Sequence, residues 1–549
     1  MKLSYKYLLI VLGTFVFTSC EIDSFLTVAN PNDLSADSFW STELEVQQGL
    51  VATYGALQLD GLLGAAAAIE LPVRSDIGRP NNWNANARAL NTMEFNENTA
   101  IVKRKWQACY IGIYRANQVL ANLDNVEMAD EVRTQIEAET RFLRGYYYYL
   151  LYRGYNKGSV IIHTDVPKTS EDFYKNPSPA TEVFALILGD LEFAEANLPL
   201  VYASDDDLGR ASWGAAAAML GKLHINERDY AAAQPYFKQI IESGVYSLTA
   251  NIGDNFDEAH EFNSESIFEV AFSIEAKAGT AGGAQDGPTG SEATARSRSF
   301  APGGNGWRTV MPSYWVTTLY RTDTMDMNNP INADRTGTAN YSIRASVSIA
   351  IADDDNSTFY QKPSAEGGQY NNREASYLKK FQNWTWDREL QTSQSGINER
   401  VIRLADVMLL YAECLIQTGG SFSEAMTMVN EIRERAGVVL LKEGDHDANS
   451  LMEHIMWVER PLELMFEGHD IRWEDLTRWG KVKEQFDRLS TRQYVQVDKV
   501  LYEFDPVEHA GMDPLPDDNV EAAQFYNSDL HDYFPIPSTE LNSNPGIVK

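Results

Sequence analysis

The chain has 549 residues and a formal net charge of -32 at pH 7, with 44% hydrophobic and 23% charged residues. This length exceeds that of a usual single core, so we expect either two lobes or one extended scaffold with large insertions. A surface this acidic repels phosphate backbones, which argues against nucleic acid as a partner and disfavours highly anionic polysaccharides unless a local basic patch attracts them.

Residues 1–19 are predicted to form an export signal. Lys2 and Lys6 make the start positive, and the apolar stretch YLLIVLGTFVF follows. This stretch is too short to span a bilayer, which needs about 20 residues. It ends in FTSC, which resembles a bacterial lipobox, so we expect cleavage before Cys20 and lipidation of the Cys20 thiol. The alternative is an ordinary secretory signal with a chance cysteine.

From Asp37 onward the apolar periodicity is predominantly helical. Residues 211–244 and 401–437 each have the length of a tetratricopeptide-like helical hairpin, and a weaker unit covers residues 102–152. The first hairpin is expected to turn between Asn226 and Asp229. In the second, a Gly-Gly break precedes Ser421 or Ser423 as the helix cap. Since each hairpin has one apolar face, we expect the hairpins to stack.

Two stretches between the helical blocks lack this periodicity. Residues 277–306 contain eight glycines and predict a long loop, and residues 322–396 are irregular and rich in aromatic and acidic residues. The predicted organisation after the signal is a single domain, 20–549, with a helical part over 20–270, loop-rich insertions over 271–400, and a second helical part over 401–549. The fold class is therefore all-α with minor β structure.

Beyond Cys20 there are two cysteines, Cys109 and Cys414, each within a helix-like apolar pattern. We expect two buried free thiols, although an exported protein could oxidise them if they lay close together.

The strongest indication of catalysis is a row of three glutamates, Glu459, Glu463 and Glu467, spaced i, i+4 and i+8. Neighbours on such a helical face lie about 6 Å apart, close to the roughly 5 Å that separates the carboxylates of retaining glycosidases. We favour a structural role instead, in which the row pairs with arginines and locks two helical blocks together. The candidate partners are Arg433, Arg435, Arg472 and Arg478.

Other catalytic and metal signatures are missing. The acidic runs 205–207 and 353–355 lack the spacing of a calcium-binding loop, so we interpret them as solvated loop charge. We therefore expect no enzyme, no metal and no cofactor.

Binding without chemistry is indicated by aromatic residues in irregular segments, because sugars pack C–H groups on aromatic faces and pair their hydroxyls with amides and charged groups. The alternative for each ring is core packing. The periodic tryptophans Trp106, Trp213, Trp457, Trp473 and Trp479 are expected in the core. The candidate ligand-binding residues are Arg79, Asn82, Trp83, Trp307, Arg308, Tyr314, Trp315 and Trp384.

Seven ordered blocks resemble those of the SusD/RagB family of nutrient-binding lipoproteins. The departures from the family pattern are small: His469 and Asp470 stand where the family most often has one arginine, and Gly145 replaces an alanine. The matching blocks are residues 30–57, 138–167, 211–249, 264–272 (SESIFEVAF), 403–437 (RLADVMLLYAEC and VNEIRERAG), 459–480 (ERPLELMFEGHDIRWEDLTRWG) and 533–546 (YFPIPSTELNSNPG).

This resemblance implies a lipid-anchored protein on the outer membrane, facing the cell exterior, that partners a SusC-like TonB-dependent transporter and delivers oligosaccharides or polysaccharides to it. Some members take peptides, so a peptide- or protein-binding helical scaffold is the alternative function. In the family the helix pairs face the transporter and the ligand platform uses one early loop and one loop near residue 300. Trp83 and Trp307 are therefore our first choices.

Overall fold

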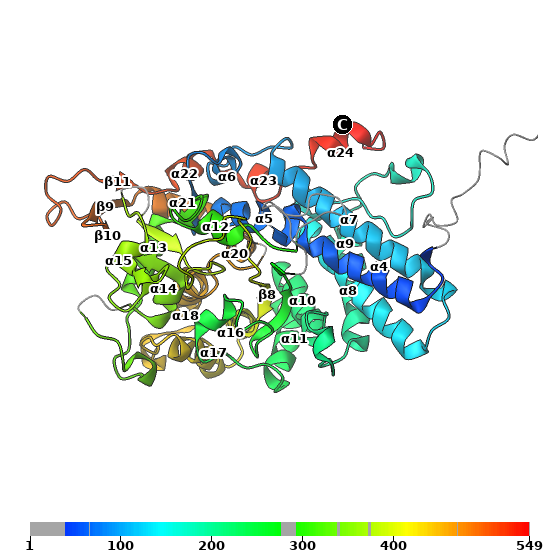
Figure 1. Cartoon of the computed structure of the whole chain (residues 1–549), viewed down its shortest axis with the longest axis horizontal. Helices are drawn as coiled ribbons and strands as arrows, with labels where there is room; N and C mark the ends of the chain where they lie inside the picture. Colours follow the sequence, from blue (N-terminus) through cyan, green and yellow to red (C-terminus); the bar gives the residue numbers. More distant parts are fainter. Residues whose placement is uncertain are drawn as a thin grey trace, which may run out of the picture.

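The computed structural model describes residues 39–64, 66–275, 292–337, 341–371, 375–468 and 470–547. The predicted signal, Cys20 and the first half of the glycine-rich stretch lie outside this range. Long helices occupy one end of the elongated molecule, and short helices, strands and loops occupy the other (Figure 1). Within the described residues, no helix combines the length and the apolar character that crossing a bilayer requires.

The long helices form one continuous stack in which each helix contacts the next. α7 packs on α8, α8 on α9, α9 on α10, α10 on α11, α11 on α16 and α16 on α17, while α4 packs on α7. All three predicted hairpins are confirmed, as α7–α8, α10–α11 and α16–α17. The bounds are α4 (Glu43–Gly55), α7 (Ala100–Asn122), α8 (Asp130–Gly154), α9 (Ala180–Asn197), α10 (Trp213–Asn226), α11 (Tyr230–Glu242), α16 (Leu404–Thr418) and α17 (Phe422–Arg435).

Local capping explains why these hairpins turn where the sequence predicts. α10 ends at Asn226, and the side chain of Asp229 accepts a hydrogen bond from the amide of Ala232 to start α11. α16 ends at Thr418 and is capped by Gly419, whose φ of 70° is in the left-handed region that favours glycine. The side chain of Ser421 then caps α17.

The remaining α-helices are short. They are α5 (Ala66–Glu70), α6 (Ala85–Asn91), α12 (Arg296–Phe300), α13 (Tyr314–Thr322), α14 (Ile343–Ser348), α15 (Ser364–Gly367), α18 (Ala448–His454), α19 (Arg460–Glu463), α20 (Ile471–Trp479), α21 (Val482–Ser490), α22 (Val520–Phe525), α23 (Ser528–His531) and α24 (Ser538–Ser543), with a π-helical segment, η11 (Ile455–Glu459), between α18 and α19.

The strands are short and form small antiparallel sheets: β1–β3, β2–β8, β4–β7, β5–β6 and the three-stranded β10–β9–β11. β2 lies in the family block 264–272, and β8 runs directly into α16. The bounds are β1 (Gly78–Pro80), β2 (Ser266–Val270), β3 (Val310–Pro312), β4 (Ile349–Ile351), β5 (Thr358–Phe359), β6 (Lys362–Pro363), β7 (Ser376–Leu378), β8 (Glu399–Arg403), β9 (Gln493–Val497), β10 (Val500–Glu503) and β11 (Leu515–Pro516).

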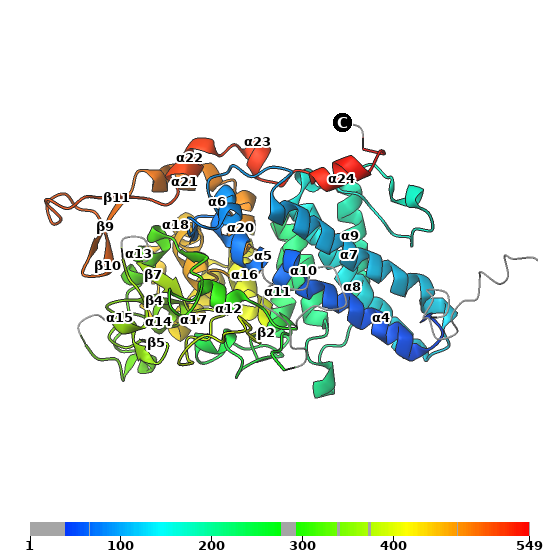
Figure 2. The same cartoon turned by 45° about the horizontal axis from the view of Figure 1, so that its top comes forward.

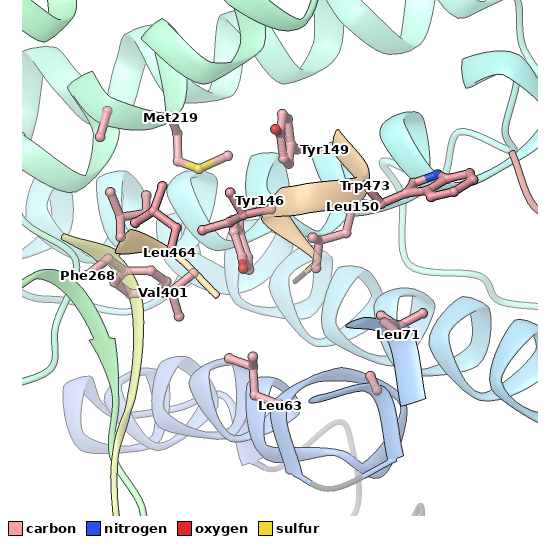
Figure 3. Packing of buried hydrophobic residues seen from close by; sticks show 14 of the residues in the cluster. Leu63, Leu71, Tyr146, Tyr149, Leu150, Met219, Phe268, Val401, Leu464 and Trp473 are labelled. Carbon is pink, nitrogen blue, oxygen red and sulfur yellow. The ribbon is translucent and has the colours of Figure 1, made fainter. Parts of the chain in front are cut away.

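One hydrophobic core unites segments from both ends of the sequence. Tyr146 and Tyr149 of α8 lie among Leu63, Leu464 and other buried side chains from distant parts of the chain (Figure 3). Burying apolar surface contributes about 25 cal/mol per Å² to the free energy of folding, so this shared core stabilises the contact between the stack and its insertions.

The loop-rich region contains more local structure than expected. The described part of the predicted 277–306 loop includes helix α12, and residues 322–396 hold α14, α15 and four short strands. A separate cluster of buried residues, including Phe359, Tyr360 and Tyr377, gives this region a small core of its own.

Candidate ligand-binding site

Two loops that are far apart in the sequence meet through one short strand pair. β1 and β3 run antiparallel with Arg79 opposite Met311, and the amide of Asn81 donates to the carbonyl oxygen of Thr309 at 2.9 Å. Because a strand ladder fixes which residues lie opposite each other, the loop after β1 is held against the loop before β3.

The two first-choice tryptophans are adjacent on the surface. Trp83 is 58% exposed and Trp307 is 39% exposed. The indole Nε1 of Trp83 donates a hydrogen bond to the carbonyl oxygen of Trp307 at 3.2 Å. Core packing is therefore excluded for both rings, and they mark one surface.

Each tryptophan is held by a tight local structure. The side chain of Asn84 accepts from the amide of Ala87 and starts α6 directly after Trp83. The amide of Trp307 donates to the carbonyl oxygen of Arg298 at 2.9 Å. At Gly306 a Cβ would lie 2.3 Å from that same oxygen, so the turn before Trp307 requires glycine.

A cleft of about 570 Å³ lies beside the tryptophan pair. Asn82 and Arg308, the chain neighbours of the two tryptophans, line it together with Arg79 and Tyr314. The rest of the cleft wall comes from the segment that follows β11. In both views this segment and α22 lie next to α6 (Figure 1, Figure 2). The cleft has the size of typical small-ligand pockets, about 300–1,000 Å³.

The side chain of Arg79 is held in the cleft by two contacts. Its guanidinium lies 4.6 Å from the ring centre of Tyr314, and its Nε donates to the carbonyl oxygen of Pro312 at 3.1 Å. Its Nη2 is buried and has no hydrogen-bond partner in the protein. A buried donor without a partner costs about 1–3 kcal/mol, which a ligand oxygen would recover.

The acidic wall of the cleft was not predicted. Asp518 accepts a hydrogen bond from the amide of Tyr314 at 2.8 Å and lies 3.9 Å from Nε of Arg79. Burial, reinforced by Asp517, raises the pKa of Asp518 to about 7, although Arg79 acts in the opposite direction. The sequence assigned no role to Asp517, Asp518 or Arg88, which all line the cleft.

Two of the predicted ligand-binding residues lie elsewhere. Trp315 is only 2% exposed, so the expectation that its ring is exposed is wrong. Trp384 is partly buried against the small core of the loop-rich region, and Nζ of Lys379 lies 3.5 Å from its ring centre. Neither residue lines the cleft. Tyr314 does line it, although its ring is largely buried beneath Arg79.

The expected core tryptophans divide into two groups. Trp106 and Trp473 are buried, as predicted. Trp213, Trp457 and Trp479 are only partly buried, and of these Trp213 and Trp457 pack against the core, as predicted.

The three glutamates that suggested catalysis are buried in a network of ion pairs. Glu459 pairs with Arg344 and Arg433, Glu463 with Arg344, Arg403 and Arg435, and Glu467 with Arg403 and Lys380. All three are at most 2% exposed. The structural interpretation is therefore confirmed, and these carboxylates are closed to solvent.

Details of that prediction are corrected. Glu467 lies beyond the end of α19, so the three carboxylates do not share one regular helix. Arg472 pairs with Asp76 instead, and Arg478 with Glu413 and Asp475. Sequence spacing cannot reveal Asp76 and Glu413 as partners because they come from distant segments.

The acidic run 353–355 is also less solvated than expected. Asp354 is buried and accepts a hydrogen bond from Oγ of Ser346 at 2.6 Å. Asp353 pairs with Arg321 at 2.9 Å. In contrast, Asp205 and Asp206 are exposed, as predicted.

Among the described residues, one group has the geometry to hold a metal ion: Asp254, Asp257 and His260. His260 Nδ1 lies 3.0 Å from Asp257 Oδ1, so an ordinary hydrogen bond also explains their proximity. Cys109 and Cys414 are both free and buried, as expected.

Comparison with known proteins identifies two matching family models. The model described as the SusD family matches residues 264–549, and the model described as starch-binding associating with outer membrane matches residues 24–225. A curated relative, SusD-like protein P25 of Formosa agariphila, is 25% identical over 98% of this chain and 97% of its own length.

Solved structures of similar proteins share the fold. A SusD superfamily protein from Bacteroides vulgatus covers 93% of this chain and 99% of its own, with a TM-score of 0.75 and 22% identity. A laminarin-binding SusD-like protein covers 92% of this chain and 99% of its own, with a TM-score of 0.66 and 23% identity. Surface glycan-binding protein A from Bacteroides thetaiotaomicron, in complex with laminarihexaose, covers 92% and 98%, with a TM-score of 0.64 and 20% identity.

Proposed function

This chain belongs to the SusD family, and from that premise we propose that it is an outer-membrane lipoprotein that binds oligosaccharides or polysaccharides and passes them to a TonB-dependent transporter. Association with the outer membrane and carbohydrate binding in nutrient uptake are the family properties. Anchoring through Cys20, exposure at the cell exterior and the SusC-like partner are the finer parts of the proposal.

The single observation that supports a glycan site most strongly is the adjacent, exposed pair Trp83 and Trp307 beside the polar cleft. Indole faces pack against the C–H groups of sugar rings, while Arg79, Asn82 and Arg308 provide donors for hydroxyl or ring oxygens. Two relatives of the same fold are named for glycan binding. The site therefore fits a saccharide that lies across the tryptophans with one end in the cleft.

We assign the chain no catalytic role. The carboxylates with the spacing of a glycosidase pair, Glu463 and Glu467, are buried and bound to arginines, so no substrate reaches them. Hydrolysis needs one carboxyl group that holds a proton. Here burial is outweighed by Arg435, Arg403 and Arg344, which lower the pKa of Glu463.

The site is tested by the double substitution Trp83→Ala and Trp307→Ala. Loss of both rings removes about 1–1.5 kcal/mol of stacking each, or roughly a hundredfold in affinity. We expect this loss in isothermal titration calorimetry with the glycan that the wild-type protein binds best in a panel containing laminarin and starch oligosaccharides. The melting temperature should change little, because both rings are exposed.

Tyr114→Ala is the matched control, because this tyrosine is also exposed (40%) but lies on α7, away from the cleft. Unchanged glycan affinity in the double variant would refute the site. Binding of peptides and of no glycan in the same panel would instead favour the alternative, a peptide- or protein-binding scaffold of the same uptake type.

A further inference from the structure

A second pocket, of about 440 Å³, opens beside α13 and shares no lining residue with the cleft. Trp315 and Trp457, two tryptophans that the glycan site does not use, contribute to its wall, and Tyr502 of β10 contributes a third aromatic ring. Trp457 is partly buried and Tyr502 is 39% exposed, so both rings present surface to the pocket.

Three arginines line the same pocket, and the aromatic rings hold two of them. The guanidinium of Arg488 lies 5.0 Å from the ring centre of Trp457 and 5.8 Å from that of Trp315. Arg321 lies 4.7 Å from the ring centre of Tyr502. Stacking on an aromatic face leaves the N–H edge of a guanidinium available to an anion.

The positive charge of the pocket is only partly balanced. Arg321 is paired with Asp353 at 2.9 Å, but Arg492 lies 4.0 Å from its nearest acid, Glu503, the one acidic residue of the lining. Arg488 donates from Nε and Nη2 to Oε1 of Gln485, a neutral partner, which fixes the plane of its guanidinium.

Other arginines lie close to Arg488. Partial burial and the charge of Arg492 lower the pKa of Arg488; Asp76 acts in the opposite direction, and Arg472 lowers the pKa by a smaller amount. The overall charge of -32 does not cancel this local potential. Charges farther away than the Debye length, about 8 Å at physiological ionic strength, are largely screened.

We propose that this pocket binds an acidic sugar unit, whose carboxylate or sulfate is held by Arg488 and Arg492 while its ring packs on Trp457 and Tyr502. Paired guanidinium groups suit the planar or tetrahedral oxygens of such anions. A pocket made of indole and phenol faces favours a sugar ring over an extended acidic peptide. The proposal does not rest on the Trp83–Trp307 site.

The experiment compares matched acidic and neutral probes on the complete mature protein. Oligogalacturonate is compared with its methyl ester, and dextran sulfate with dextran, by titration calorimetry at low and high salt. We expect at least about tenfold tighter binding of an acidic probe, weakening as salt rises. The double variant Arg488→Gln and Arg492→Gln should abolish that preference, and the two acidic probes distinguish carboxylate from sulfate.

The matched control is the double variant Lys481→Gln and Lys483→Gln, which removes two positive charges at α21 that do not line the pocket. Its affinity for the acidic probe should stay within about twofold of wild type, and the preference should also survive in Trp83→Ala/Trp307→Ala. Equal binding of acidic and neutral probes, or equal losses in the lysine and arginine variants, would overturn the proposal. So would preferential binding of oligoglutamate. Circular dichroism melting of the arginine variants serves as the check that they fold.

Discussion

Glu70 and Glu463 are both buried glutamates, but their surroundings differ. Burial raises the pKa of Glu70 to about 7, and Arg104 and Asn84 offset that effect only in part. Its Oε2 has no hydrogen-bond partner in the protein. Glu463 meets Arg403 at 2.7 Å and Arg435 at 2.6 Å, and its pKa is lowered despite its burial. The same residue type therefore has opposite effects on stability at neutral pH.

We predict that Glu70→Gln stabilises the protein at about pH 8 and has little effect at about pH 4. The pKa of Glu70 is raised in the folded state. The stability that protonated Glu70 provides is therefore complete below pH 4.5 and is lost as the pH rises through about 7. This shift corresponds to as much as about 3 kcal/mol. Urea unfolding at several pH values measures it.

Glu463→Gln is the comparison with the opposite sign. Because the pKa of Glu463 is lowered, its ionised carboxylate contributes stability above pH 4.5, and this stability is lost as the pH falls below that value. Removing its charge leaves Arg403, Arg435 and Arg344 without this buried partner. The free energy of unfolding should fall by about 3–5 kcal/mol at neutral pH. A Glu70→Gln variant that is destabilised at about pH 8 would contradict this account.

At the level of elements, close helix contacts depend on glycine at particular positions. α7 and α8 approach each other at Gly112, where a Cβ would lie 2.4 Å from the ring of Tyr147. That ring is buried, and its hydroxyl donates to the carbonyl oxygen of Thr53 at 2.7 Å, so it has little freedom to move. The close approach of α7 and α8 therefore depends on a residue without a Cβ at position 112.

We predict that Gly112→Ala destabilises the protein by about 1–3 kcal/mol, because overpacking outweighs the gain in helix propensity. Gly189→Ala is the control: Gly189 is an exposed position inside α9, and a Cβ there meets nothing within 4 Å. That substitution should stabilise by up to about 1 kcal/mol. Urea unfolding measures both, and equal effects of the two substitutions would show that the helix contact does not require glycine.

The strand pair β1–β3 has the largest functional consequence of any element. Each strand has only three residues, yet the pair joins Trp83 to Trp307 across 224 positions of the sequence. Neither strand shows the alternation over four or more residues that predicts a strand. Their pairing is a tertiary event, which explains why the sequence suggested the tryptophans but could not show that they are adjacent.

At the level of the whole molecule, the stack, the glycan site and the predicted anchor must act together. A single acyl chain binds membranes only marginally, so stable attachment requires the several chains of a bacterial lipoprotein. We predict that the protein expressed in its own host fractionates with the outer membrane and co-purifies with a TonB-dependent transporter. Cys20→Ala should shift it to the soluble fraction.

Cys109→Ala is the matched control for that fractionation, because it removes a buried thiol and leaves the lipobox intact. This variant should remain in the membrane fraction. A Cys20→Ala protein that still sediments with the outer membrane would refute lipid anchoring. The partnership is tested separately, because wild-type protein that co-purifies with no TonB-dependent transporter would contradict it.

The sequence by itself determined the helical hairpins, their turns at Asp229 and Gly419, and the family. These features depend on local periodicity, capping residues and ordered motifs. It also singled out Trp83 and Trp307, because aromatic residues in irregular, amide-rich or glycine-rich segments are unlike core residues. Their presence on one surface, however, is a property of the fold.

Only the tertiary structure decided which distant groups meet. It buried Trp315, gave Glu463 its arginine partners, added Asp518 to the cleft and gathered Arg488 and Arg492 beside Trp457. The physical reason is that burial and electrostatic pairing depend on distances in space, and loop segments without regular periodicity carry no record of those distances in their residue order.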